Sequence, residues 1–255
     1  MWTALAVLLI VLALWLALIM PARSMSAQRA PFCGRMFAHR GLFSKDQCVP
    51  ENSLAAFRAA VEADYGVELD VQLTRDKQVV VFHDDDLKRA CGIDARVDAY
   101  SYDELQTLSL FGTQERIPLF TDVLAVLDGK IPMIVELKSG GDWKALCPKT
   151  LELLQAYKGD YSVESFHPLL VRWFYLNAPQ ILRGQLSEAA RFSRKGLPLY
   201  QAIMMSRLFT NILTHPQFIA YRVGPKCLSV RICEWLGAMR VAWTARPTDD
   251  HARLT

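Results

Sequence analysis

The stretch G-V-E-L-D-V-Q-L at residues 66–73 is strand-like and places two carboxylates among otherwise apolar residues. Side chains two residues apart on a strand point to the same face, so Glu68 and Asp70 are predicted to lie side by side. Taken alone, such a pair is more often a salt-bridge partner or part of a solvated face. Inside a strand core, however, a charge is costly unless it is paired or bound to a metal.

Strand-like runs on both sides of this stretch end in polar residues of the same kind. A-H-R-G carries His39, V-V-V-F-H-D carries His83, and M-I-V-E-L-K carries Glu136 and Lys138. In a (β/α) barrel the carboxyl ends of the strands converge on one mouth, where active sites lie. Each motif is weak by itself, but the ordered series predicts a single site.

Strand-like and helix-like segments alternate after residue 36, which predicts an α/β fold, a TIM-type (β/α) barrel. Strands are expected at residues 36–39, 66–73, 79–83, 132–138, 161–166, 181–186, 218–223 and 241–244, and helices at 53–63, 101–108, 121–127, 143–157, 168–177, 200–210 and 226–236. Residues 79–83 suit either a barrel strand or the return arm of a hairpin, so the number of strands stays open.

The N-terminal run Trp2–Met20 contains no charged residue, and a helix of that length can span a hydrocarbon core of roughly 30 Å. A cleaved secretory signal would have a basic start and a shorter apolar run. Here the arginines follow the run, which predicts a retained single span with the catalytic domain in the cytoplasm. We therefore expect an anchor at residues 1–21, a linker at 22–35, and a barrel at 36–255 with an insertion at 84–116.

Composition argues against nucleic acid as a partner and leaves open whether the cysteines are reduced or form disulfides. The net charge is +3, from 29 basic and 26 acidic residues, and no basic cluster stands out, so we expect no nucleic-acid binding. The six cysteines include no C-x-x-C pair. They suit free thiols in a reducing cytoplasm, while disulfides in an exported domain are the alternative.

The order of the motifs resembles that of the glycerophosphodiester phosphodiesterase family. To the motifs above it adds P-E-N-S at 50–53, I-P-L-F at 117–120, S-F at 165–166 and A-W-T at 242–244, so the resemblance covers residues 36–244. It implies a barrel with a divalent cation at its mouth. It also implies hydrolysis of glycerophosphodiesters to glycerol 3-phosphate and an alcohol.

The resemblance assigns a role to each matching position. It implies His39 and His83 as the catalytic acid–base pair, Glu68, Asp70 and Glu136 as metal ligands, Arg40 and Lys138 as phosphate-binding groups, Glu51 and Asn52 beside the site, and Phe166 and Trp243 as pocket-lining aromatics. Histidine suits proton transfer near neutrality. Three hard oxygen donors suit Ca²⁺ or Mg²⁺ and suit copper or zinc poorly.

The sequence also departs from the family pattern at its end. The family continues beyond the A-W-T motif into a further strand, whereas this chain stops at Thr255. Pro247 and the helix-start pattern at Thr248–Asp250 make a poor strand, which favours a barrel truncated before its last strand. The alternative is that the tail after Thr244 folds across the gap.

Two rival functions remain at this stage. A lysophospholipase D-type activity on lysolipids is supported by the anchor, which would keep the site near bilayer substrates. A catalytically inactive membrane scaffold is supported by the missing strand. The buried charges argue against the scaffold, because a chain without catalysis has no physical reason to keep them.

Overall fold

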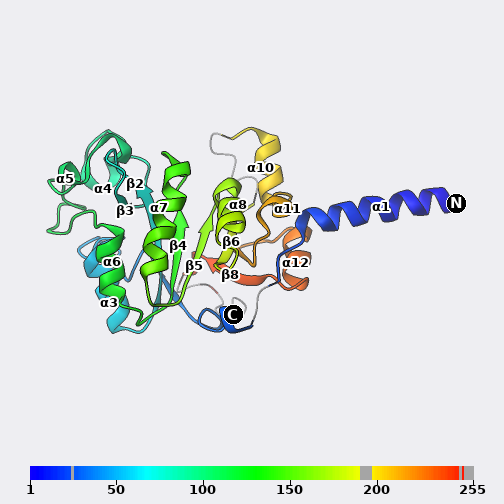
Figure 1. The fold of residues 1–255 in the computed structure, drawn as a ribbon, viewed down its shortest axis with the longest axis horizontal. Helices are drawn as coiled ribbons and strands as arrows, with labels where there is room; N and C mark the ends of the chain where they lie inside the picture. The colour runs from blue at the N-terminus through cyan, green and yellow to red at the C-terminus, as the bar shows by residue number, and fades with distance from the viewer. Residues whose placement is uncertain (24–25, 190–196, 247–248, 250–255) are drawn as a thin grey trace. The chain divides into compact units, whose positions relative to one another are not determined.

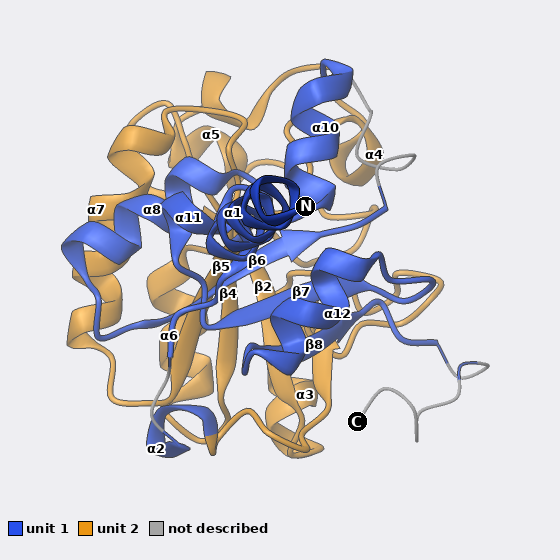
Figure 2. Ribbon diagram, turned by 90° about the vertical axis from the view of Figure 1, so that its right-hand side faces the viewer, with its two compact units in different colours: residues 1–29, 165–255 blue, residues 30–164 orange. Residues whose placement is uncertain are grey.

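The structure is a computed structural model that describes residues 1–23, 26–189, 197–246 and 249 (Figure 1). The chain divides into two compact units, shown in two colours in Figure 2. One unit is Ala30–Glu164, and the other combines Met1–Arg29 with Ser165–Thr255. All of the predicted metal ligands and both predicted catalytic histidines belong to the first unit.

The Ala30–Glu164 unit is built on a parallel sheet. Its strands are β1 (Phe37–His39), β2 (Gly66–Leu73), β3 (Val79–Val81), β4 (Met133–Leu137) and β5 (Tyr161–Ser165). β1 pairs with β2, β2 with β4 and β4 with β5, all in parallel. β3 pairs antiparallel with β2, so residues 79–83 begin as the return arm of a hairpin rather than as a barrel strand.

Three helices of this unit pack on its strands through their apolar faces. They are α3 (Leu54–Glu62), α6 (Phe120–Leu127) and α7 (Trp143–Ala156). α3 begins where Ser53 accepts a hydrogen bond from the backbone N–H of Ala56, at 3.1 Å, as expected for a side-chain cap. Every residue of β2 is buried, which suits a strand with both faces covered.

The insertion at 84–116 has a small apolar core of its own. It contains α4 (Lys88–Cys91), a 3-10 turn η1 (Val97–Ala99) and α5 (Tyr102–Leu105), where the sequence predicted only one helix. Leu87, Val97 and Leu105 pack in one cluster with Val80 and Phe82. This packing fixes the chain on both sides of His83, and so it fixes that histidine at the end of the hairpin.

The second unit repeats the alternation of strands and helices. β6 (Leu182–Ser187), β7 (Phe218–Arg222) and β8 (Met239–Trp243) run in parallel. Its helices are α8 (Pro168–Asn177), α10 (Leu199–Ser206), α11 (Asn211–Thr214) and α12 (Leu228–Trp235), with a single helical turn α2 at Ser26–Arg29. α11 was not expected from the sequence. The expected helix start at Thr248–Asp250 lies outside the described residues apart from Asp249.

α1 (Trp2–Ile19) is the one helix of the described residues that is long and apolar enough to cross a membrane. Its last residue, Ile19, is fully buried in a cluster with Leu208, Val230 and Cys233. The carbonyl of Ile19 also accepts a hydrogen bond from Nδ2 of Asn211, at 3.1 Å. The end of α1 is therefore part of the core of this unit. The strands belong to one eight-stranded sheet, in which all but β3 run in parallel. This sheet and its helices confirm the predicted α/β class, and the barrel identification rests on the comparison below.

Gly41, in the turn after β1, packs closely on α3, and Gly34, before β1, offers a comparison without such packing. Gly34 and Gly41 both have positive φ, of 68° and 78°. A Cβ on Gly34 would meet nothing within 4 Å, whereas on Gly41 it would lie 2.9 Å from Cβ of Ala56. We expect Gly34→Ala to lower the free energy of unfolding by about 1–2 kcal/mol, the cost of a left-handed backbone. Gly41→Ala should cost about 1–3 kcal/mol more, because it also overpacks α3.

Urea unfolding of both variants measures this difference. Gly34→Ala serves as the matched control, because it carries the backbone strain without the steric clash. Equal losses of stability in the two variants would mean that the turn does not press against α3.

Candidate active site

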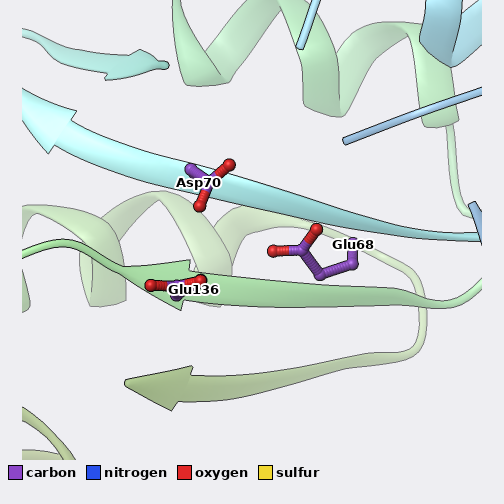
Figure 3. A group of neighbouring side chains, drawn as sticks. All are labelled: Glu68, Asp70 and Glu136. Carbon is purple, nitrogen blue, oxygen red and sulfur yellow. The ribbon is translucent and has the colours of Figure 1, made fainter. Parts of the chain in front are cut away.

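Three carboxylates converge on the neighbouring strands β2 and β4 (Figure 3). Glu68 and Asp70 lie on β2, and Glu136 lies opposite Asp70 in the register of β2 with β4. All three side chains are buried, and one oxygen of each lies within 4.8 Å of the others. The structure therefore brings together the three residues that the sequence predicted as ligands.

A fourth buried carboxylate, which sequence analysis missed, belongs to the same group. Glu164 on β5 lies opposite Glu136 in the parallel register, so Asp70, Glu136 and Glu164 form a row across three neighbouring strands. Its side chain is 4% exposed, and among the described residues its Oε2 has no hydrogen-bond partner. The signal was present in the sequence, since Y-S-V-E-S also places a carboxylate inside an apolar strand.

Two basic side chains offset part of this negative charge. Nζ of Lys138 lies 2.9 Å from Oε1 of Glu136 and 3.3 Å from Oδ1 of Asp70. Nε of Arg40 lies 3.6 Å from Oδ2 of Asp70. Burial opposes the charged form of Lys138, but the carboxylates of Glu136 and Asp70 raise its pKa above the usual value. Lys138 therefore stays positively charged although it is buried.

The carboxylates still outnumber these cations. Burial, followed by repulsion from Asp70 and Glu136, raises the pKa of Glu68 well above its usual value. Burial and the same two neighbours raise the pKa of Glu164 in the same way. Burial alone would raise the pKa of Asp70 as well, but Lys138 holds it below the usual range. The unbalanced charge and the orphaned oxygen of Glu164 fit a site that takes a divalent cation.

Hydrogen bonds join the turn after β1 to the P-E-N segment and join both of them to β2. The backbone N–H of Asn52 donates to the carbonyl of Arg40 at 2.8 Å, and the backbone N–H of Arg40 donates to Oε2 of Glu68 at 3.1 Å. Nδ2 of Asn52 donates to Oδ2 of Asp70 at 2.8 Å. Arg40 and Asn52 both hold positive φ values, of 60° and 55°, which a non-glycine residue rarely adopts. These bonds stabilise that backbone and orient two of the carboxylates.

His39 ends β1 beside the carboxylates. Its Nε2 lies 3.9 Å from Oε2 of Glu68. Burial, with a smaller contribution from the positive charge of Arg40, lowers the pKa of His39 to about 4. The ring is therefore neutral at physiological pH, and one of its nitrogens has a lone pair that can accept a proton.

His83 is held by a chain of ion pairs that includes Arg89, which the sequence did not single out. Nδ1 of His83 lies 2.6 Å from Oδ1 of Asp84, and Nε of Arg89 donates to the other oxygen of Asp84, also at 2.6 Å. Arg89 donates in addition to Oε1 of Glu51 at 2.6 Å, and Glu51 pairs with Arg40 at 2.8 Å. Glu51, predicted to bind substrate, therefore joins the two histidine-bearing segments.

An open pocket of about 540 Å³ adjoins this network. Its lining includes His83 and Lys138, so two predicted site residues face it together with charged residues of the insertion. The full lining is His83, Asp84, Asp85, Asp86, Lys88, Arg89 and Lys138. Asp84, which lies against Nδ1 of His83, orients that ring at the edge of the pocket.

The two predicted aromatic residues belong to the other unit. The rings of Phe166 and Trp243 meet edge to face, with centroids 5.5 Å apart and planes at 87°. Nε1 of Trp243 donates to the carbonyl of Ala220 at 3.1 Å, and Nε2 of Gln185 donates to the carbonyl of Phe166 at the same distance. The structure thus brings these two aromatics together and fixes both by hydrogen bonds.

Comparisons with known proteins agree with this geometry. The model of the glycerophosphoryl diester phosphodiesterase family matches residues 39–194. A glycerophosphodiester phosphodiesterase of Caldanaerobacter subterraneus subsp. tengcongensis is 29% identical over 231 residues, which cover 86% of this chain and 88% of that protein. A lysophospholipase D of Rattus norvegicus is 31% identical over 154 residues, 55% of this chain, and the match spans 47% of that longer protein.

Solved structures give the fold. A phosphodiesterase of Oleispira antarctica, determined in complex with the product sn-glycerol-3-phosphate, superposes with a TM-score of 0.68. It is 24% identical in sequence, and the match covers 84% of this chain and 86% of that structure. The parallel sheet of this chain therefore has the fold of the barrels in this group of phosphodiesterases. The chain belongs to the glycerophosphoryl diester phosphodiesterase family and is a phosphoric diester hydrolase.

Proposed function

We propose that the protein uses a divalent cation to hydrolyse glycerophosphodiesters to glycerol 3-phosphate and an alcohol. The observation that carries this proposal is the group Glu68, Asp70 and Glu136, buried and within 4.8 Å of one another, with His39 at its side. The complex of the Oleispira antarctica phosphodiesterase with sn-glycerol-3-phosphate supports the same product.

Glu68, Asp70 and Glu136 are the residues that would hold the cation, and hard carboxylate oxygens favour Ca²⁺ or Mg²⁺. When bound, the cation supplies positive charge that stabilises the phosphoryl oxygens. Lys138 and Arg40 add positive charge beside it, and we assign them to binding the phosphate. Asn52 positions Asp70, and Glu51 positions Arg40.

The two histidines differ in a way that suggests their roles. We assign the base to His39, because its neutral ring can accept the proton of an attacking hydroxyl. We assign the acid to His83, whose Nδ1 is held by Asp84, so that Nε2 exchanges a proton with the leaving oxygen. If the attacking hydroxyl belongs to the substrate beside its phosphate, the product of this step is a cyclic phosphate that water then opens. Phe166 and Trp243 would line the substrate pocket.

We propose in addition that α1 is a retained membrane anchor, that residues 22–35 link it to the barrel, and that the catalytic domain lies in the cytoplasm. The burial of Ile19 in the core of its unit supports retention, because cleavage after this residue would remove its side chain from that core. The arginines after α1 support the orientation.

A lysophospholipase D-type activity is the second candidate function. The 31% identity with the lysophospholipase D of Rattus norvegicus favours it, and a membrane anchor would supply lysolipid substrates. Parallel assays with glycerophosphocholine and lysophosphatidylcholine, each with and without a chelator, separate the two activities. Turnover of neither substrate would favour the inactive scaffold.

The first prediction from the proposed function concerns the cation. We expect Glu68→Gln to abolish activity and the rise in melting temperature that Ca²⁺ or Mg²⁺ causes in the wild type. In the absence of metal the same variant should melt above the wild type, because it loses the repulsion from Asp70 and Glu136. Glu62→Gln, an exposed replacement on α3, is the control. A Glu68→Gln protein that turns over substrate without binding metal would end the proposal.

The second prediction concerns the histidines. We expect His39→Ala and His83→Ala each to lower kcat by at least about a hundredfold with the melting curve unchanged. Because the pKa of His39 is about 4, this base is unprotonated above that pH, and its contribution to kcat/KM should be lost only as the pH falls through about 4. His215→Ala, outside the site, is the control. Near-normal turnover of either variant removes that histidine from the mechanism.

The third prediction concerns topology. Because the arginines follow the apolar run, protease added to intact cells should leave the catalytic domain uncut, and permeabilised cells should lose it. Cutting in intact cells would reverse the orientation. A mature N-terminus after Met20 would show that α1 is a cleaved signal.

A further inference from the structure

Helices α10 and α11 expose the side chains that a water-facing helix would bury. Their buried positions hold small or polar residues, namely Ala202, Ser206, Asn211 and Thr214. Their exposed positions hold large apolar ones, namely Leu199, Tyr200, Ile203, Met204, Ile212 and Leu213. On the surface helix of a water-soluble domain the apolar stripe faces the core. A contiguous exposed apolar patch marks an interaction site.

Helix α12 presents a similar outer face. Leu228, Arg231 and Trp235 are spaced three and four residues apart, so they lie on one side of the helix. The opposite side is buried through Val230 and Cys233. Trp235 is 83% exposed, which is unusual for the largest apolar side chain. Tryptophan and arginine are typical of the interface between a bilayer and water.

These helices lie around the base of α1. α1 packs against α11 and α12, and its terminal Ile19 shares a core cluster with Val230 and Cys233 of α12. Seen along α1, the three helices α10, α11 and α12 surround it, and the side view places them on the face from which it projects (Figures 1 and 2). We call the exposed apolar side chains of these three helices the α10–α12 surface.

The free length of α1 is too short to span a bilayer alone. Residues 2–14 are exposed, while Trp15, Leu16 and Leu18 are partly covered by the core cluster and Ile19 is fully buried. At 1.5 Å per residue the exposed part is about 20 Å long, compared with roughly 30 Å of hydrocarbon. If α1 spans the membrane, the protein surface around its base must enter the interfacial region.

The charge of this region suits an anionic bilayer. Residues 197–240 contain five Lys or Arg residues and a single acidic residue, Glu234. Lys226 pairs with that glutamate at 2.5 Å, and Arg222 pairs with Glu188 at 3.1 Å. Arg207, which follows α10, and Arg231 of α12 are exposed beside the apolar side chains. Basic residues beside an apolar surface attract anionic headgroups.

We propose that the α10–α12 surface is an interfacial membrane-binding surface, which inserts its apolar side chains among the headgroups of an anionic bilayer around α1. This inference rests on the anchor role proposed for α1. It adds a second attachment to the membrane. The unit that contains α1 is held against the bilayer by the α10–α12 surface as well as by α1.

The test uses the full chain with α1 unable to span. Leu8→Lys with Leu9→Lys changes two exposed residues of α1, so the fold stays intact, and the two charges prevent stable insertion. We expect this variant to float with vesicles of phosphatidylcholine and phosphatidylglycerol, and to do so less as salt is added. Failure to float with these vesicles would overturn the inference.

Matched variants in the same background identify the surface. Ile203→Glu, Leu213→Glu and Trp235→Glu together should weaken partitioning at least about a hundredfold, since each buried apolar side chain contributes roughly a factor of ten or more. Serine at the same three positions should act in the same direction without added charge. Met36→Glu, at an equally exposed apolar residue of the Ala30–Glu164 unit, should leave partitioning unchanged. Equal flotation of the triple variants and the control would overturn the inference.

Alkaline extraction of the wild type separates this inference from the anchor. If the wild type stays in the membrane pellet while the Leu8/Leu9 variant fails to float, the anchor stands and the α10–α12 surface is wrong. If the wild type is extracted while the variant still floats, the anchor is wrong and the surface stands.

Discussion

Repulsion among buried carboxylates is the constraint on which the Ala30–Glu164 unit depends. Asp70, Glu136 and Glu164 stand in register on three adjacent strands, with Glu68 on the same face of β2. Such a row is tolerated only with compensating charge. Lys138 and Arg40 provide part of this positive charge. The raised pKa values of Glu68 and Glu164 reflect the burial and the negative charge that these two cations do not balance. This imbalance of charge suits the site to a divalent cation.

The backbone around the site follows from this constraint. The backbone N–H of Arg40 donates to Glu68, and the backbone N–H of Asn52 donates to the carbonyl of Arg40. The side-chain amide of Asn52 donates to Asp70. These bonds hold both residues in left-handed conformations. Gly41 then passes so close to Ala56 that only glycine fits. Strain of this kind persists where surrounding contacts determine the geometry, and it is common at active sites.

Sequence patterns predicted most of the strands and the clustering of the three carboxylates. They did not predict contacts that depend on pairing between distant strands or on the insertion. The bounds of β2 and the clustering of Glu68, Asp70 and Glu136 followed from alternation and strand order, which are local properties. Glu164 was missed because its importance comes from register across three strands. The role of Arg89 depends on an insertion whose apolar core the sequence did not reveal. The exposed apolar faces of α10 and α11 could not be assigned either, because periodicity gives two faces without saying which one is buried.

Cation binding coupled to proton release tests the central claim most directly. If the cation replaces protons on carboxylates whose pKa values are raised, calorimetric titration with Ca²⁺ or Mg²⁺ in two buffers of different ionisation enthalpy should give one site per chain. At about pH 6 it should also show release of protons to the buffer. Binding with no proton release, or no binding by a protein that hydrolyses glycerophosphodiesters, would contradict the account.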